Sequence, residues 1–148
     1  MKKIIFSLLV FAVINARAAT PPEVNEKILK AFKETFTYAE DVVWQENDNH
    51  YQVNFWQGEI NIRARYDEQG NLLGTIRYYY EKQLPPTIVS EIKRRYKGKT
   101  IFCVTEVATE EAINYYVTLR DDKKWYIIKS DVLGNLQLTD KFKRADGE

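Results

Sequence analysis

Cysteine and histidine are almost absent from this chain of 148 residues, which contains one of each, Cys103 and His50. A single cysteine cannot form a disulfide within the chain, so the disulfide-stapled class of exported domain is excluded. One histidine cannot build a histidine-based metal site, and no G-x-S-x-G or similar context supports a Ser-His mechanism. We therefore expect no metal, no cofactor and no enzymatic activity. We expect Cys103, in the apolar stretch IFCV, to be a small buried side chain.

Net charge is low as well. The chain carries 22 basic and 21 acidic residues, for a net charge of +1. A general nucleic-acid surface needs a strong excess of Lys and Arg, which this composition lacks. We therefore expect no nucleic-acid partner.

Long hydrophobic runs are limited to one, IIFSLLVFAVI at residues 4–14, which follows two lysines and precedes Ala16-Arg17-Ala18. A basic start, a short apolar core and an A-x-A site are typical of a secretory signal peptide. The run is too short to span a bilayer comfortably. We predict a signal peptide over residues 1–18; a membrane-anchoring or buried helix is the alternative. The exported chain would be periplasmic or secreted, without a membrane span. It would also lack a lipid anchor, because its one cysteine lies far from the cleavage site.

The sequence repeats itself once. YDEQGNL at residues 66–72 returns as SDVLGNL at residues 130–136, which places Gly70 and Gly134 64 residues apart. A gap-free shift of the same size matches further apolar and turn positions, which are the ones that specify a fold. The matched pairs include Pro21 with Pro85, Pro22 with Pro86, Val24 with Ile88, Ile28 with Ile92, Phe32 with Tyr96, Val43 with Val107, Tyr51 with Tyr115 and Val53 with Val117. We predict two copies of one unit, residues 19–82 and 83–148, that together form one globular body.

Each predicted copy opens with one amphipathic helix. In the first copy, apolar residues follow Pro21-Pro22 at a spacing that lines one helix face, and Thr20 with Glu23 has the spacing of a capping box. The first apolar stripe consists of Val24, Ile28, Ala31, Phe32 and Phe36. The second stripe consists of Ile88, Ile92 and Tyr96, and Gly98 is the predicted stop.

After each helix the apolar period changes to two, which is typical of strands with one buried face. The predicted strands cover residues 42–44, 51–55, 60–66 and 72–79 in the first copy, and 104–107, 115–119, 125–129 and 136–139 in the second. The predicted fold class is therefore α+β, a tandem duplication of one helix and about four antiparallel strands.

The repeated motif itself predicts a hairpin turn. Asp67 can accept backbone N–H bonds at the start of a tight turn, and Gly70 can adopt the positive φ that re-enters the next strand. Asp131 and Gly134 repeat this chemistry. A calcium loop needs more oxygen ligands at close spacing than either copy supplies.

Several stretches of the chain together resemble one family. These are AEDVVW at 39–44, YQVNF at 51–55, YDEQGNLLGT at 66–75, LPPTIVSEI at 84–92, TEV at 105–107 and YYVTL at 115–119. They are similar to the exported PepSY-like proteins that are described as beta-lactamase-inhibitor-like (BLIP-like), a family largely without assigned function. The resemblance implies two sheets joined edge to edge, with the helices on one side and an open face on the other. The sequence departs from the pattern at Thr37 and lacks the inhibitor's disulfides, so inhibition of beta-lactamase is not inferred.

The strand alternation also predicts which side chains occupy the open face. If Tyr51, Val53 and Phe55 face the helices, the opposite face carries aromatic residues interleaved with basic ones. This combination favours protein interfaces, because rings bury area at low entropic cost and guanidinium groups bind carboxylates in a fork. The candidate partner-binding residues are Trp56, Arg63, Arg65, Arg77, Tyr79, Tyr116, Arg120, Trp125 and Lys129. The alternative is a solvated face whose aromatic and cationic side chains only cover the strands.

Two functions remain open at this point. The favoured one is an exported non-enzymatic binding protein, inhibitor-like in mode, whose open face binds an envelope or extracellular protein or peptide. An acidic protein, a peptide carboxylate or an anionic glycan would suit the cationic side chains. The alternative is a small-ligand carrier or a cystatin- or NTF2-like pocket protein, which needs a polar residue pointing inward between helix and sheet. The predicted inward positions are nearly all apolar or tyrosine, which favours binding through the open face.

Overall fold

The computed structural model describes residues 23–145, so the predicted signal peptide at residues 1–18, with Thr20, Pro21 and Pro22, lies outside the described residues. The described part forms one antiparallel sheet of eight strands that are neighbours in chain order. The helical elements are α1 (Glu26–Thr35), η1 (Glu81–Gln83) and α2 (Pro86–Arg95). The strands are β1 (Glu40–Asn47), β2 (His50–Gln57), β3 (Ile60–Tyr66), β4 (Leu72–Tyr79), β5 (Thr100–Thr109), β6 (Ile113–Arg120), β7 (Lys124–Ser130) and β8 (Leu136–Lys143). None of the helices in this part is long and apolar enough to cross a membrane.

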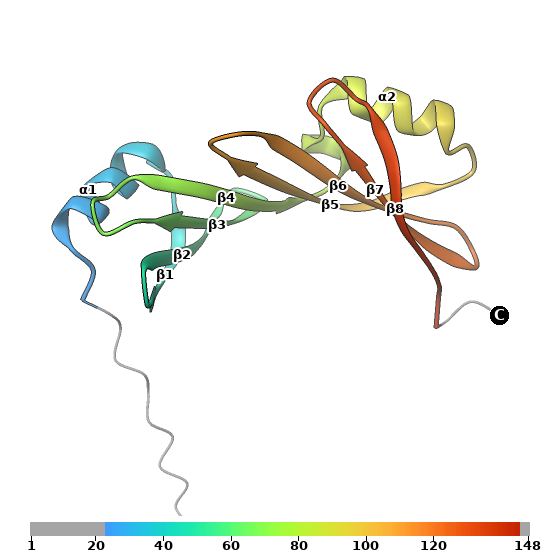
Figure 1. The fold of residues 1–148 in the computed structure, drawn as a ribbon. Helices are drawn as coiled ribbons and strands as arrows, with labels where there is room; N and C mark the ends of the chain where they lie inside the picture. Colours follow the sequence, from blue (N-terminus) through green and yellow to red (C-terminus); the bar gives the residue numbers. More distant parts are fainter. Residues whose placement is uncertain (1–22, 146–148) are drawn as a thin grey trace, which may run out of the picture.

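Four strands follow each of the two α-helices along the chain. In space, α1 lies beside the first half of the sheet and α2 beside the second (Figure 1). The halves join directly, because residues 74–79 of β4 pair with residues 104–109 of β5. The sheet therefore runs without interruption from β1 to β8. The predicted order of one helix and four strands in each half agrees with this arrangement.

Each helix packs its apolar side chains on its own half of the sheet. In α1, Ile28 and Phe32 share a buried cluster with Val53, Phe55 and Ile62. In α2, Ile88 and Ile92 share a second buried cluster with residues that include Val117, Leu119 and Ile128. Burying these side chains favours folding by about 1.5–3 kcal/mol each, so packing rather than helix propensity holds two helices of only ten residues.

The helix starts differ partly from the prediction. Asn25 is the N-cap of α1, and its side-chain oxygen accepts a hydrogen bond from the Lys27 amide at 2.8 Å. An asparagine satisfies one of the free N–H groups that begin a helix. In α2, Pro86 is the first helical residue, where its missing N–H costs nothing. The first-turn proline is therefore confirmed for the second half.

The gap-free matching of the helices is wrong by four residues. Ile28 and Ile88 hold the same place in their helices, as do Phe32 and Ile92, so the helices are 60 residues apart and not 64. The difference lies in the β5–β6 hairpin, which is longer than the β1–β2 hairpin. Four residues are close to one helical turn of about 3.6 residues. An alignment of the two helices that is shifted by four residues therefore still pairs the apolar residues of one helix with the apolar residues of the other.

The two repeated turns have the same hydrogen bonds, which confirms the predicted hairpin turns. Asp67 accepts from the Gln69 and Asn71 amides at 2.9 and 2.8 Å, and from the Asn71 side chain at 2.8 Å. Asp131 accepts from the equivalent groups of Leu133 and Asn135 at 2.9, 3.0 and 2.7 Å. The glycine that follows has a φ of +87° in the first turn and +84° in the second.

A bulge in β4 overturns two of the predicted side-chain directions. Arg65 pairs with Gly74 and Tyr66 with Leu72, so Leu73 is an extra residue between them. An extra residue reverses the alternation that follows it. Arg77 therefore pairs with Ile62, on the helix side, and Tyr79 is buried in the second cluster. Neither residue lies on the open face.

Candidate functional site

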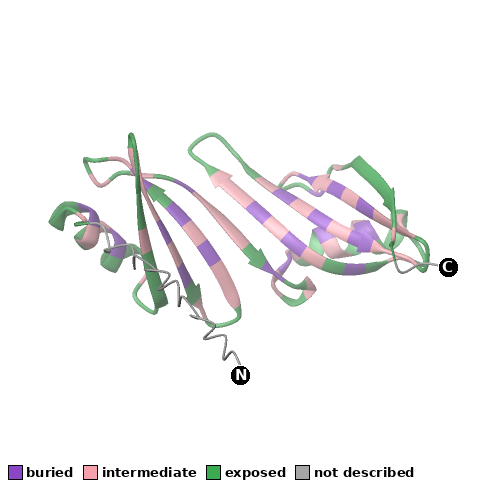
Figure 2. Cartoon of the chain, turned by 90° about the horizontal axis from the view of Figure 1, so that it is seen from below, coloured by how far each residue is buried: buried purple, intermediate pink, exposed green. Residues whose placement is uncertain are grey.

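The open face is the side of the sheet opposite the helices, seen from below in Figure 2, where buried and intermediate residues alternate along the central strands. We assign residues to this face from the strand register: the residues that pair with Asn54, Arg63 and Tyr116 belong to it, and so does every second residue along each strand from these. Its members include Asn54, Trp56, Asn61, Arg63, Arg65, Ile76, Tyr78, Cys103, Thr105, Val107, Tyr116, Thr118, Arg120, Trp125, Ile127, Lys129 and Phe142.

One row of paired residues crosses the open face through six strands. It runs from Trp56 through Asn61, Tyr78, Thr105 and Tyr116 to Lys129. Aromatic and small polar side chains alternate along this row as far as Tyr116, and Lys129 ends it. Neighbouring strands lie about 4.8 Å apart, so successive rings in the row are about 10 Å apart. A smaller polar side chain lies between each ring and the next.

The first half of the open face contributes two arginines from β3. Arg63 donates from Nε to Asn54 Oδ1 at 3.0 Å, which holds the guanidinium across two strands. Arg65 is exposed and pairs with Gly74, which has no side chain to cover it. Arg63 and Arg65 are therefore neighbouring cations on the open face. The guanidinium of Arg63 is held in place, and that of Arg65 can change its orientation.

The second half carries aromatic rings in contact with cations. Phe102 and Trp125 meet edge to face with centroids 4.9 Å apart. The Arg120 guanidinium lies 5.1 Å from the Phe102 ring, and that of Arg144 lies 5.5 Å from the Trp125 ring. Cation–π contacts of this kind orient a guanidinium group. Arg144 also donates from Nη1 to the backbone oxygen of Asp121 at 3.0 Å. Lys129 lies 6.0 Å from the Tyr116 ring and adds a further positive charge.

A cleft lies on the open face where the two halves meet. It has a volume of about 150 Å³. Its lining residues are Trp56, Glu59, Asn61, Tyr78, Tyr79, Tyr80, Cys103, Val104 and Thr105. The expectation that Cys103 is buried in the core is wrong: it pairs with Thr118 on the open face and is half-buried. The bulge between Ile101 and Cys103 sets this direction.

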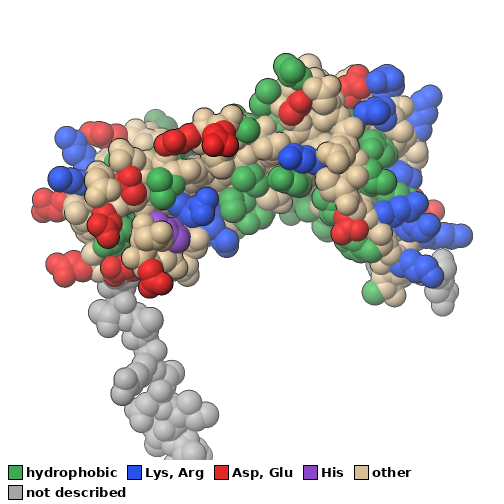
Figure 3. Space-filling view, in the orientation of Figure 1, with side chains coloured by type: hydrophobic (Ala, Val, Ile, Leu, Met, Phe, Trp, Pro, Cys, Tyr) green, Lys and Arg blue, Asp and Glu red, His purple; other side chains and the backbone are tan. Residues whose placement is uncertain are grey.

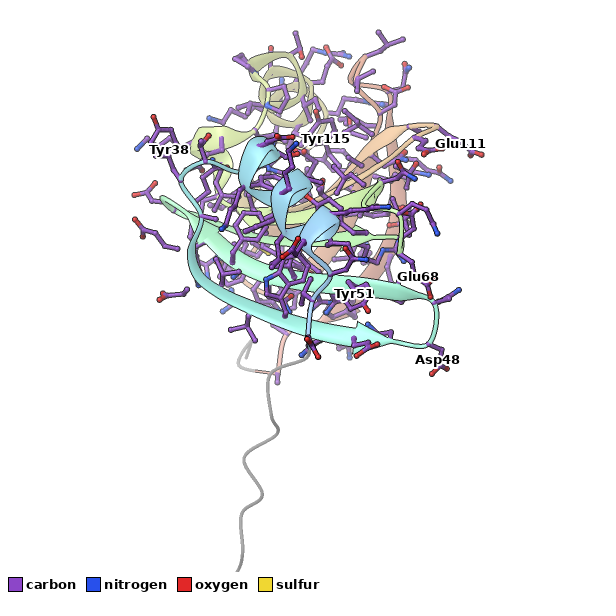
Figure 4. The ribbon with its side chains drawn as sticks, turned by 90° about the vertical axis from the view of Figure 1, so that its left-hand side faces the viewer. Tyr38, Asp48, Tyr51, Glu68, Glu111 and Tyr115 are labelled. Atoms are coloured by element: carbon purple, nitrogen blue, oxygen red, sulfur yellow. The ribbon has the colours of Figure 1, made fainter. Side chains whose placement is uncertain are left out.

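The underside of the molecule is hollowed between its halves, with Lys and Arg side chains on both flanks and hydrophobic ones near the middle (Figure 3). Three acidic residues lie in hairpin turns: Asp48 between β1 and β2, Glu68 between β3 and β4, and Glu111 between β5 and β6. All three point outward on the same side of the view in Figure 4. The open face also carries carboxylates, because Glu40 pairs with Trp56 and Asp140 pairs with Ile127.

Seven of the nine predicted partner-binding residues lie on the open face. They are Trp56, Arg63, Arg65, Tyr116, Arg120, Trp125 and Lys129. Arg77 and Tyr79 lie on the helix side instead, because of the β4 bulge. Sequence reasoning missed Tyr78, Phe102 and Phe142, which are on the open face and partly exposed. Tyr78 would follow from the alternation once Leu73 is recognised as the extra residue.

The helix side has a polar group that the alternation did not predict. The Tyr79 hydroxyl donates to Glu106 Oε2 at 2.6 Å, and Arg77 Nη1 donates to Glu106 Oε1 at 3.2 Å. Burial, with the Glu106 carboxylate, raises the pKa of the Tyr79 hydroxyl above its usual value. Both carboxylate oxygens of this inward acid therefore accept a hydrogen bond. Within residues 23–145, no group of three or more metal-ligating side chains is gathered.

Comparison with known proteins supports the fold. No family model matches the sequence, and no curated protein matches it. Among solved structures, a BLIP-like protein from Bacteroides fragilis has 18% identity and a TM-score of 0.63, covering 88% of this chain and 92% of its own. A DUF2874 family protein from Bacteroides uniformis has 16% identity and a TM-score of 0.59, covering 80% and 88%. A protein from Bacteroides eggerthii that is named as periplasmic has 12% identity and a TM-score of 0.61, covering 82% and 90%. The chain therefore has the fold of BLIP-like proteins, as its sequence resemblance implied.

Proposed function

We propose that this chain is an exported, non-enzymatic binding protein whose open face takes an acidic protein or peptide in the cell envelope or outside the cell. The observation that carries the proposal is a face with Arg63, Arg65, Arg120 and Lys129 interleaved with aromatic rings. No helix of residues 23–145 covers this face. We also propose that its two halves are copies of one duplicated unit.

Physical chemistry supports an acidic partner. Aromatic and arginine side chains are enriched where proteins bind each other, and Arg binds carboxylates in a bidentate fork. Complementary charge across an interface raises the association rate and disfavours wrong partners. The concave shape allows a convex partner to contact both halves at once. The BLIP-like neighbour and the neighbour named as periplasmic support binding and export, respectively.

The pocket-protein alternative has less support. Its requirement was an inward polar residue in a cavity between helix and sheet. Glu106 points inward, but Tyr79 and Arg77 satisfy it, and the core side chains of Phe55, Ile62 and Tyr66 are at most 1% exposed. Close packing leaves a small ligand little room beside these residues.

Partner capture tests the proposal. Envelope extract is passed over immobilised residues 19–148, and retained proteins are identified by mass spectrometry. The matched arms are the parent, Arg63→Glu/Arg65→Glu on the open face, and Lys33→Glu/Lys97→Glu, which makes the same charge change on exposed sites outside this face. We expect an acidic protein that the parent and the lysine variant retain and the arginine variant loses.

Salt provides a second readout in the same experiment. Because charges at the rim of an interface are screened by salt, retention should fall as ionic strength rises from about 0.05 to 0.5 M. Circular dichroism and melting temperature confirm that each variant is folded. Equal retention by all three proteins would remove the arginines from the function.

A further inference from the structure

The cleft at the β4–β5 junction lies at the centre of the open face and differs from the surface around it. Its lining includes the aromatic residues Trp56, Tyr78 and Tyr80. The buried Val104 and two residues with small side chains, Cys103 and Thr105, also line it. At about 150 Å³, the cleft is the size of one large side chain and too small for a typical drug-sized ligand.

We propose that this cleft is the anchor pocket for one aromatic or large aliphatic side chain of the partner, presented on an acidic segment. The proposal rests on the function proposed above and names the chemistry of its partner. A single side chain that fills a desolvated pocket near the centre of an interface commonly supplies much of the binding energy. The exposed cations around it would then set orientation.

Cations flank the cleft in two opposite directions. Arg63 is the next open-face residue after Asn61 along β3, and Asn61 lines the cleft. Arg120 is the next after Thr118 along β6, and Thr118 pairs with the cleft residue Cys103. Each step is two residues along a strand, or about 7 Å. Asn61 and Thr118 lie on opposite sides of the β4–β5 junction, so Arg63 and Arg120 are placed on opposite sides of the pocket.

The positions of Arg63 and Arg120 on opposite sides of the pocket indicate which charges the partner carries. A carboxylate on each side of the anchoring side chain would meet Arg63 on one side and Arg120 on the other. Arg120 is held against the Phe102 ring at 5.1 Å, so little side-chain freedom is lost on binding. The carboxylate at the rim, Glu59, already faces Lys82 at 3.7 Å and accepts from Gln83 at 3.1 Å, which lowers its repulsion toward an acidic partner.

The single cysteine makes occupancy of the cleft measurable. Cys103 is the sole thiol in the sequence and lines the cleft, so its alkylation by iodoacetamide reports access to that space. The probes are two blocked pentapeptides, one with phenylalanine between two pairs of acidic residues and one with alanine in its place. We expect the phenylalanine peptide to slow alkylation in a saturable way and to bind about tenfold more tightly than the alanine peptide.

Variants assign the effect to the cleft and to its flanks. Peptide binding is also followed by fluorescence anisotropy with Cys103→Tyr, which fills the cleft, and with Val132→Tyr, which adds the same side chain at an exposed turn position outside the open face. We expect loss of phenylalanine-peptide binding in the Cys103 variant and parent-like binding in the Val132 variant. Thr105→Tyr fills the same space from the neighbouring position and replaces the first variant if that one does not fold. Arg63→Gln/Arg120→Gln should weaken both peptides.

The outcomes separate this inference from the proposed function. Equal binding of the two peptides, or unchanged binding after the cleft is filled, would overturn the anchor pocket. No protection of Cys103 by either peptide at millimolar concentration would overturn it as well. In each case the capture experiment with Arg63→Glu/Arg65→Glu still decides independently whether the open face binds an acidic partner.

Discussion

Glu106 is the one charged residue that is buried among residues 23–145, with 8% of its surface exposed. It lies on β5 where β4 and β5 join the halves, and it receives hydrogen bonds from Tyr79 and Arg77 on β4. A buried carboxylate is tolerated only when its oxygens are satisfied, and here both are. Glu106 on β5 therefore links β5 to β4 through side-chain hydrogen bonds at the central junction.

Removal of this carboxylate should destabilise the protein. Glu106→Ala leaves the Tyr79 hydroxyl and the Arg77 guanidinium without their acceptor, at a cost of about 1–3 kcal/mol in the free energy of unfolding. The lower end applies if water reaches Arg77, whose side chain is 35% exposed. Urea unfolding measures the change. Glu59→Ala removes an exposed carboxylate and should cost less than about 1 kcal/mol. Equal losses in the two variants would contradict the structural role of Glu106.

Asp121, in the turn between β6 and β7, should make stability depend on pH. Hydrogen bonds from the Tyr126 hydroxyl at 2.7 Å and Lys99 Nζ at 3.0 Å hold the pKa of its carboxyl well below the usual 3.8. Since its pKa is lower in the folded state, this carboxylate stabilises the fold above about pH 4 and loses that effect as the pH falls further. We expect Asp121→Asn to be less stable than the parent at pH 7, with the difference shrinking toward pH 2.

Acid titration of unfolding, by urea melts at several pH values, checks the Asp121 prediction. Asp122→Asn is the matched control, because Asp122 is the exposed neighbour in the same turn. A difference between the parent and Asp121→Asn that stays constant from pH 7 to pH 2 would show that this carboxylate does not act through its ionised form.

At the scale of the element, β4 decides how the two halves of the open face combine. Its bulge at Leu73 reverses the alternation, which turns Ile76 and Tyr78 outward and Arg77 and Tyr79 inward. Gly74, directly after the bulge, lets the strand approach β5 closely. A Cβ atom at this position would lie 2.6 Å from the Ala108 carbonyl oxygen. The central junction therefore depends on a residue without a side chain.

Gly74→Ala should disrupt this junction. The added methyl group meets backbone on β5, which cannot move aside as a flexible side chain would. We expect a loss of about 2–4 kcal/mol in unfolding free energy, measured with urea. Gly58→Ala is the control: Gly58 has a φ of +59° but no atom within 4 Å of an added Cβ, so its cost should stay near 1 kcal/mol. A smaller loss at Gly74 than at Gly58 would contradict the close approach of the strands.

At the scale of the whole molecule, one sheet joins two separate hydrophobic clusters. Phe55 belongs to the cluster under α1, and Leu119 belongs to the cluster under α2. Ile60 packs against both clusters, and six residue pairs link β4 to β5. Because the strands are hydrogen-bonded throughout, we expect the halves to unfold together.

A core truncation in one half should therefore destabilise the other. Phe55→Ala is expected to lower the global stability by about 3–5 kcal/mol. Native-state hydrogen exchange should show the loss in the slowest amides of both halves, including those of β6 and β7. Leu119→Ala provides the reciprocal experiment, with loss expected in β2 and β3. A loss confined to the mutated half would show that the halves are independent folding units.

Local patterns in the sequence determined much of this fold. The Asp-x-x-Gly-Asn turns, the apolar helix stripes and the period-two strands each depend on neighbouring residues, so they can be read from the chain directly. Seven of the nine predicted binding residues follow from that alternation. The tertiary structure decided the rest, because a bulge and a hairpin length depend on pairing between distant strands. That pairing turned Arg77 and Tyr79 inward, brought Cys103 to the open face, and formed the cleft between side chains of β2, β3, β4 and β5.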